Sequence, residues 1–298
     1  MELRAELKEK KRIVIKVGTS TVTYEKTGNI NLDKLEKFVR VLINLRNKGK
    51  EVIVVSSGAI GIGRNVLGIE KRPEGALKQA CAAVGQGRLM MIYEKFFSEY
   101  SQFTAQVLLT KESIYSTECR KYARETFEAL LAMGVVPIVN ANDAISVDEG
   151  GYGNFADNDT MSADVAALIG ADLLIMMSDI EGLYTDDPRV NPNARFVHTV
   201  NHIDASLEAM AKGAGTDLGT GGMATKIEAA RIATEAGADM VIANGDNIYA
   251  INDVMAGKKV GTLFLSKDRR YEGGNELAPV RDIVRKRRER GKSRKQTR

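Results

Sequence analysis

Short, almost uninterrupted apolar runs alternate along the chain with longer segments in which apolar residues recur every three or four positions. The run RIVIKVG at 12–18 predicts a strand, and residues 32–49 predict a helix with Leu35, Phe38 and Leu42 on one face. The same alternation continues to residue 266. It predicts strands at 12–18, 51–57, 104–110, 135–140, 172–178, 240–244 and 261–266, and helices at 32–49, 76–100, 118–134, 159–171 and 226–238.

The predicted strands are apolar along nearly their whole length rather than at every second position. Such strands are typical of a mostly parallel sheet that helices cover on both faces, because each strand is then buried on both sides. The pattern therefore predicts an α/β protein. We expect one domain over residues 1–266, followed by a basic tail at 267–298 that is partly disordered or forms one short helix.

Composition places the chain among globular proteins, since it has 298 residues of which 44% are hydrophobic. No apolar run reaches the roughly 18 residues of a membrane span, and the first residues, MELRAELKEKKR, lack the apolar core of a signal peptide. Cys81 and Cys119 both fall in helix-like segments, which argues against a disulfide framework. We expect a cytoplasmic protein without membrane partners.

The net charge of +4 is unevenly distributed. Residues 281–298 hold ten Lys or Arg against Asp282 and Glu289, a local charge of +8, so the rest of the chain carries 4 − 8 = −4. A mildly acidic body argues against an extended nucleic-acid surface, and a basic terminus is usually only solvated. Nucleic acid is therefore not the expected partner.

Glycine, serine, threonine, asparagine and aspartate crowd the segments that follow the predicted strands. Among them are KVGTS, SSGAIGIG and, before a predicted helix, the octamer GTGGMATK at 219–226. The octamer is not the P-loop G-x-x-x-x-G-K-[ST], and no strand directly precedes it as a dinucleotide fingerprint requires. Several such loops at one edge of a parallel sheet favour a polyanion site, because glycine lets backbone N–H groups surround a phosphate.

Two lysines stand where a positive charge is costly. Lys16 interrupts an apolar strand, so it is either an edge lysine that reaches solvent or a functional group facing a partner at the strand end. Lys226 begins a predicted helix, where the macrodipole disfavours a cation, and its position indicates an anion nearby. Two lysines on different loops could hold the same transferring phosphoryl group.

Acidic residues crowd the loop before the predicted helix at 159–171. Asp148 and Glu149 are expected to be solvated, whereas Asn158 and Asp159 at the helix start either cap the helix or bind a substrate amine and hold the two lysines. His198 and His202 have i, i+4 spacing but lie in a strand-like segment without a glutamate, so a zinc site there is not favoured.

Seven sequence motifs follow one another along the chain, namely VIKVGTS, VSSGAIGIG, KQACAAVGQGRLM, VPIVNANDA, FADNDTMSADVA, DIEGLYTDDPR and GTGGMATKIEAA. With these motifs the chain closely resembles the amino acid kinase family, and within it the branch that phosphorylates L-glutamate. The resemblance covers residues 11–266 in consistent order. It implies a three-layer αβα fold and transfer of the ATP γ-phosphoryl group to the side-chain carboxylate of L-glutamate, giving γ-glutamyl phosphate for proline biosynthesis.

The resemblance also implies roles for residues that match the family's motifs. It implies that Lys16, Lys226 and Asp159 are catalytic, with Asp159 organising the two lysines. It further implies ATP with Mg²⁺, for which no protein ligand is identified, a homo-oligomer, and inhibition by proline. The implied glutamate-binding residues are Ser57, Asp143 and Asn158, and the implied nucleotide-binding residues are Lys16, Ser178, Asp179, Gly221, Gly222, Met223, Ala224, Thr225 and Lys226.

Two alternatives stay open on the sequence. The first is another amino acid kinase that acts on N-acetylglutamate, aspartate or carbamate. The second is a non-catalytic nucleotide-sensing or RNA-binding module on the same fold, although intact Lys16, Asp159 and Lys226 favour catalysis. Many bacterial members of the glutamate branch continue into a PUA domain, and residues 267–298 are too few and too polar to form one.

Overall fold

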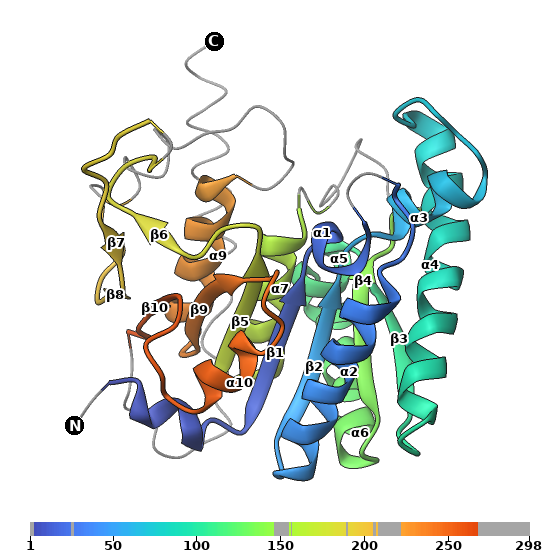
Figure 1. Cartoon of the computed structure of the whole chain (residues 1–298). Helices are drawn as coiled ribbons and strands as arrows, with labels where there is room; N and C mark the ends of the chain where they lie inside the picture. Colours follow the sequence, from blue (N-terminus) through green and yellow to red (C-terminus); the bar gives the residue numbers. More distant parts are fainter. Residues whose placement is uncertain are drawn as a thin grey trace.

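An eight-stranded sheet forms the centre of the molecule in the computed structural model, which describes residues 3–24, 27–145, 155, 157–188, 190–204, 207 and 222–267 (Figure 1). The strand order is β3-β4-β2-β1-β5-β9-β10-β8, and a separate hairpin pairs β6 with β7. The pairs from β3 to β9 are all parallel, and only β10 runs antiparallel to β9. The strands are β1 Arg12–Val17, β2 Glu51–Ser56, β3 Thr104–Leu109, β4 Val136–Ala141, β5 Leu173–Ser178, β6 Leu183–Tyr184, β7 Phe196–Val197, β8 Thr199–Val200, β9 Asp239–Asn244 and β10 Thr262–Phe264.

Helices cover both faces of the sheet and create two hydrophobic cores. One core joins the sheet to α2, α3, α4 and α10, and the other joins it to α6, α7 and α9. The expected αβα sandwich with a mostly parallel sheet is therefore confirmed. The helices are η1 Ala5–Glu9, α1 Thr19–Val22, α2 Leu32–Asn47, α3 Ala59–Val66, α4 Gly75–Ser98, α5 Lys111–Tyr115, α6 Thr117–Ala132, α7 Asn158–Ile169, α9 Met223–Glu235 and α10 Ala250–Met255.

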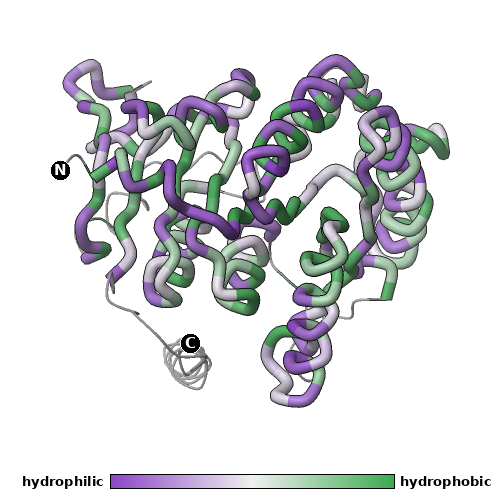
Figure 2. The backbone as a smooth tube through the Cα atoms, turned by 90° about the horizontal axis from the view of Figure 1, so that it is seen from below, coloured by the Kyte–Doolittle hydropathy of each residue, from purple (hydrophilic) through white to green (hydrophobic). Residues whose placement is uncertain are grey.

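The apolar runs become the central strands because these strands are buried on both sides. All six residues of β5 are buried, and in β1 only Arg12, at its beginning, is partly exposed. Seen from below, hydrophilic and hydrophobic colours alternate along the helices, as expected for helices with one buried face (Figure 2). None of the helices in the described part of the chain is long and apolar enough to cross a lipid bilayer.

The glycine-rich segment after β2 contains an element that the sequence pattern did not predict. Residues Ala59–Val66 form α3, which packs directly on α4. A Cβ atom on Gly63 would lie 1.8 Å from the carbonyl oxygen of Cys81, and one on Gly85 would lie 1.8 Å from that of Ala59. The glycines therefore permit backbone contact between two helices, and this packing outweighs their low helix propensity.

The parallel strands bring their carboxyl ends to one edge of the sheet, hereafter the C-terminal edge. Strands β1, β2, β4, β5 and β9 all end there, at the upper edge of the sheet in Figure 1. In α/β folds of this kind, ligands bind outside the carboxyl ends of the strands. This edge is where the glycine-rich and acidic segments were expected to meet.

Candidate active site

A buried carboxylate holds two buried ammonium groups at the C-terminal edge. Lys16 Nζ lies 2.7 Å from Asp159 Oδ1, and Lys226 Nζ lies 3.1 Å from Asp159 Oδ2. The relative exposures of Lys16, Lys226 and Asp159 are 8%, 4% and 2%. The structure thus brings together the three residues that the sequence pointed to, and Asp159 supplies an anion close to Lys226.

Each of the three charges comes from a different element on one face of the sheet. Lys16 is near the end of β1, where Ile13, Ile15 and Val17 point into the core on the α2 side. The alternation of a strand directs Lys16 to the opposite face, which α7 and α9 cover. Asp159 lies in the first turn of α7 and Lys226 in the first turn of α9. The interrupted apolar pattern of β1 is therefore explained by this ion-pair cluster.

The two lysines control the ionisation of Asp159. Burial alone would raise the pKa of its carboxyl group, but the charges of Lys16 and Lys226 and their hydrogen bonds outweigh burial and hold the pKa below the ordinary value. Asp159 therefore stays negatively charged at neutral pH. With both of its oxygens in contact with lysines, it fixes the positions of two positive charges that would otherwise repel each other.

This depressed pKa predicts a pH-dependent loss of stability. The unfolded chain takes up the proton of Asp159 near the ordinary aspartate pKa of about 3.9, whereas the folded protein takes it up at lower pH. The stabilisation of the folded state by ionised Asp159 is therefore complete above about pH 5. It is lost as the pH falls from there through the ordinary aspartate pKa towards the lower pKa of the folded protein. We expect urea unfolding between pH 7 and pH 3.5 to show a smaller decrease in unfolding free energy for Asp159→Asn than for the wild type.

The control for this measurement is Asp253→Asn, since Asp253 pairs with the exposed Lys258 at 2.7 Å. An exposed pair of this kind contributes little to stability, so this variant should follow the wild-type curve. An Asp159→Asn variant with the same pH dependence as the wild type would contradict the assigned ion-pair cluster.

The end of the glycine-rich octamer forms the first turn of α9. Helix α9 begins at Met223, three residues earlier than the pattern predicted, and Gly222 is its N-cap. Thr225 Oγ1 lies 2.8 Å from the Gly222 carbonyl oxygen and 3.2 Å from Asp159 Oδ2. Met223 and Ala224 lie in the same turn, whereas Gly221 lies outside the described residues. The segment that is expected to bind the nucleotide therefore adjoins the ion-pair cluster.

Two of the three residues expected to bind glutamate are in contact. Asn158 Nδ2 donates to Ser57 Oγ at 2.8 Å, and Asn158 immediately precedes Asp159 in α7. Asp143 lies beyond the end of β4, and no hydrogen bond among the described residues connects it to that pair. Burial raises the pKa of Asp143, and the charge of Lys78 on α4 offsets part of the shift.

The start of α7 excludes one of the two interpretations of Asn158 and Asp159, namely that they cap the helix. Asp157 is the N-cap, and its side chain accepts a hydrogen bond from the Thr160 backbone N–H at 2.7 Å. Asn158 and Asp159 are consequently not needed as caps, and their side chains point to Ser57 and to the two lysines. Asp148 and Glu149 lie outside the described residues.

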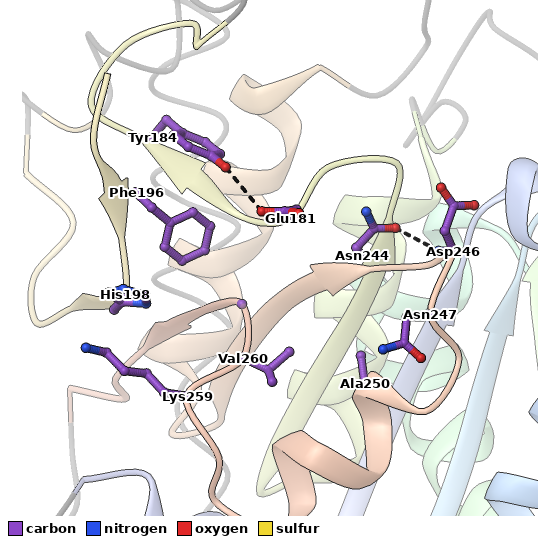
Figure 3. A pocket seen from close by; sticks show the side chains of 11 residues that line it. Glu181, Tyr184, Phe196, His198, Asn244, Asp246, Asn247, Ala250, Lys259 and Val260 are labelled. Atoms are coloured by element: carbon purple, nitrogen blue, oxygen red, sulfur yellow. Dashed lines mark hydrogen bonds between the residues drawn. The ribbon is translucent and has the colours of Figure 1, made fainter. Parts of the chain in front are cut away.

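Ser178 and Asp179, at the end of β5, are close to residues that line a cavity of about 580 Å³, since the Gly245 N–H donates to the Ser178 carbonyl oxygen. Figure 3 shows the residues that line this cavity. Ser178 Oγ donates to Asp179 Oδ1 at 2.9 Å, and Ser178 is the register partner of Asn244, which lines the cavity. The lining comes from four segments of the chain. It comprises Glu181, Tyr184, Phe196, His198, Asn244, Asp246, Asn247, Ala250, Lys259, Val260 and Gly261.

The cavity combines an aromatic wall with hydrogen-bonding groups. Tyr184 and Phe196 meet edge to face with ring centroids 5.1 Å apart, and Phe196 also packs on His198 at 4.8 Å. The amide of Asn244 and the carboxylate of Glu181 project from other sides (Figure 3). Sequence analysis missed this cavity, although Asn244 gave the same signal as Ser178, a polar residue that ends an apolar strand.

A buried arginine near the start of the chain holds one wall of the cavity. Arg4 donates hydrogen bonds to the carbonyl oxygens of Lys258, Val260, Gly261 and His198 at 2.6–3.2 Å. Three of these four acceptors belong to residues that line the cavity. Because every acceptor is an uncharged carbonyl group, burial lowers the pKa of Arg4 without a compensating carboxylate.

His198 belongs to the cavity wall. In the described part of the chain, no three His, Cys, Asp or Glu side chains lie together in a way that could hold a metal ion.

Comparison with known proteins identifies the family to which the chain belongs. The model of the amino acid kinase family matches residues 11–244. The chain belongs to the amino acid kinase family. The glutamate 5-kinase of Clostridium perfringens is 50% identical over 267 residues, which are 89% of this chain and 99% of that protein. The glutamate 5-kinase of Carboxydothermus hydrogenoformans is 52% identical over 270 residues, which are 90% of this chain and 71% of that longer protein.

Solved structures of more distant proteins share the fold. UMP kinase from Ureaplasma parvum superposes with a TM-score of 0.60 at 19% identity and covers 86% of this chain and 99% of its own. Carbamate kinase from Giardia lamblia superposes with a TM-score of 0.62 at 16% identity, and the match covers 87% of this chain and 99% of the carbamate kinase chain. At these identities the likeness concerns the fold alone.

Proposed function

We propose that this amino acid kinase transfers the γ-phosphoryl group of ATP to the side-chain carboxylate of L-glutamate, which forms γ-glutamyl phosphate in the first step of proline biosynthesis. The observation that carries the proposal is the Asp159 carboxylate between Lys16 and Lys226 at the C-terminal edge. The substrate assignment is supported by glutamate 5-kinases that are about half identical to this chain over most of its length.

Transfer between two anions depends on neutralising charge and on alignment. The attacking carboxylate is already ionised at pH 7, so the reaction needs no general base. Lys16 and Lys226 offer two ammonium groups to the transferring phosphoryl group, and Asp159 keeps both in position before the substrates arrive. In this proposal Ser57 and Asn158 bind the amino-acid end of glutamate, together with Asp143.

The nucleotide is proposed to extend from the first turn of α9 into the cavity beside Ser178. Backbone N–H groups at Gly222 to Ala224 would face the phosphates, and Ser178 and Asp179 would border the ribose. Gly221, which is also proposed to bind the nucleotide, lies outside the described residues. The Tyr184 and Phe196 wall suits a planar base.

Mg²⁺ is proposed to enter with ATP and to neutralise charge on the phosphates. Asp159 is engaged by two lysines, and the described residues offer no three-residue metal cluster. Phosphate oxygens and water would therefore supply most of its ligands, as Mg²⁺ commonly prefers.

The test of the proposed function is a panel of acids incubated with Mg·ATP, in which hydroxylamine traps acyl phosphate as hydroxamate. Glutamate should give hydroxamate, whereas N-acetylglutamate, aspartate and carbonate with ammonia, the source of carbamate, should give little. Hydroxamate from another acid and none from glutamate would overturn the substrate assignment. No product from any acid would favour a non-catalytic nucleotide-binding role.

Three further expectations stay proposals. Proline is proposed to inhibit at or near the glutamate site, and the hydroxamate assay at sub-saturating glutamate tests this with added proline. Self-association is tested by light scattering. A cytoplasmic location agrees with two free cysteines, of which Cys81 is buried and Cys119 exposed.

A further inference from the structure

A chain of side-chain hydrogen bonds connects helix α4 to the proposed glutamate-binding pair Ser57 and Asn158. From α4, Gln86 contacts Asn140 near the end of β4, and Asn140 contacts Asn158 at the start of α7. At the outer end, Gln86 also contacts Gln106 of β3. The chain thus joins four elements of the fold and ends at the hydroxyl group of Ser57.

One backbone group fixes the direction of every hydrogen bond in this chain. The backbone N–H of Ala141 can only donate, and it points to Asn140 Oδ1 at 2.9 Å. The other end of the Asn140 amide must then be the donor, and Asn140 Nδ2 donates to Gln86 Oε1 at 3.0 Å. Gln86 in turn uses Nε2 to donate to Gln106 Oε1 at 3.0 Å.

The orientation of the Asn140 amide also determines which groups donate and which accept at Asn158 and Ser57. Because Asn140 Oδ1 is an acceptor, Asn158 faces it with Nδ2, at 3.3 Å. Asn158 Nδ2 also donates to Ser57 Oγ at 2.8 Å, so both protons of this amide group are used. Among the described residues, no partner takes up the carbonyl oxygen of Asn158 or the hydroxyl proton of Ser57, so the first can accept a hydrogen bond and the second can be donated.

These remaining groups match an amino acid. A carbonyl oxygen accepts from an ammonium group, and a hydroxyl group donates to a carboxylate. If the Asn158 amide were turned over, its NH₂ group would face the ammonium group of the substrate and repel it. The orientation of one amide therefore decides whether the site recognises its ligand.

Water cannot readily replace Gln86 in this chain. Gln86 and Asn140 have relative exposures of 7% and 3%, and Gly85, the neighbour of Gln86, is in backbone contact with α3. Without the Gln86 acceptor, Asn140 Nδ2 would be buried without a partner, and turning the Asn140 amide would reverse the contact with Asn158.

We infer that Gln86 is a positioning residue that fixes the amide of Asn158, through Asn140, in the orientation that recognises the amino-acid substrate. Gln86 does not touch the substrate, and its effect is confined to substrate affinity. This inference rests on the proposed function, since that proposal places the substrate at Ser57 and Asn158.

The experiment compares Gln86→Met with Gln86→Glu in the full-length protein. Methionine has a similar shape but no oxygen acceptor, so KM for glutamate should rise about tenfold, while kcat and KM for ATP change by less than about twofold. Glutamate at position 86 retains an oxygen that accepts from Asn140, and the exposed Gln106 can turn its amide to donate. Gln86→Glu should therefore keep a nearly wild-type KM.

Gln106→Ala is the matched control, because it removes the exposed end of the same series of hydrogen bonds, where water can replace the lost group. Its KM should equal that of the wild type. Should Gln86→Met fail to fold, Gln86→Asn serves in its place, since its shorter side chain holds the acceptor out of reach of Asn140.

Equal KM values for the methionine and glutamate variants would overturn the inference, as would a loss confined to kcat. Failure of the proposed function gives a different result, namely no hydroxamate from glutamate with the wild-type protein. In that case the same KM comparison is made with the acid that the wild type does phosphorylate, and equal values again overturn the inference.

Discussion

Replacing Lys226 or Lys16 by methionine is expected to lower kcat by about 10² to 10³, the loss typical of one preorganised donor to a transition state. Each ammonium group is buried against one oxygen of Asp159, so it is fixed before the reaction and needs no reorganisation during it. Methionine retains most of the aliphatic volume but no charge. Single-turnover measurements with saturating glutamate and ATP would report the loss directly.

Folding should change less than catalysis in these variants, because Asp159 keeps the remaining lysine as a partner. The control is Lys258→Met, which removes an exposed lysine paired with Asp253 and should leave kcat unchanged. A lysine whose replacement leaves a wild-type kcat takes no part in the transfer.

Replacing Gly63 or Gly85 by alanine is expected to have the largest effect on stability. The added Cβ atom would lie 1.8 Å from a backbone carbonyl oxygen of the facing helix, so α3 and α4 would have to move apart. Overpacking of this severity costs about 3 kcal/mol or more. In a chain of this size the thermal midpoint should fall by about 6 to 12 °C, which calorimetry or circular dichroism would measure.

Gly87→Ala is the control on the same helix. A Cβ atom there meets nothing within 4 Å, and alanine favours a helix by about 0.5 to 1 kcal/mol over glycine. This variant should be as stable as the wild type or more stable. Destabilisation of Gly87→Ala equal to that of Gly85→Ala would mean that helix packing is not the cause.

The fold was predictable where burial and periodicity agree. The long helices and the parallel strands follow the apolar pattern within a few residues, because strands buried on both faces have little freedom in composition. Helix α3 was missed because its glycines indicate a loop when only local propensity is considered. Its cause is contact with Cys81 and Gly85, which belong to a helix that begins nine residues after α3 ends.

The candidate site was predictable in part for a related reason. Lys16 places a charge in an apolar strand, and Lys226 places a cation at the start of a helix. Such conflicts with local preference are expected at functional sites. Gln86 and Asn140 show no such conflict, since an amide side chain is common in a helix and at a strand end. The hydrogen bond between them is visible only in the three-dimensional structure. The cavity beside Ser178 was likewise hidden, because its wall is assembled from separate segments.

The contacts of Arg4 have a consequence for the order in which the chain acquires structure. Arg4 leaves the ribosome well before its acceptors, which follow it in the sequence by 194 residues at His198 and by 257 residues at Gly261. Contacts of such long sequence separation form late and slow the folding of a domain. The cavity wall that Arg4 holds is therefore completed only after nearly all of the described chain has been synthesised, so incomplete chains lack it.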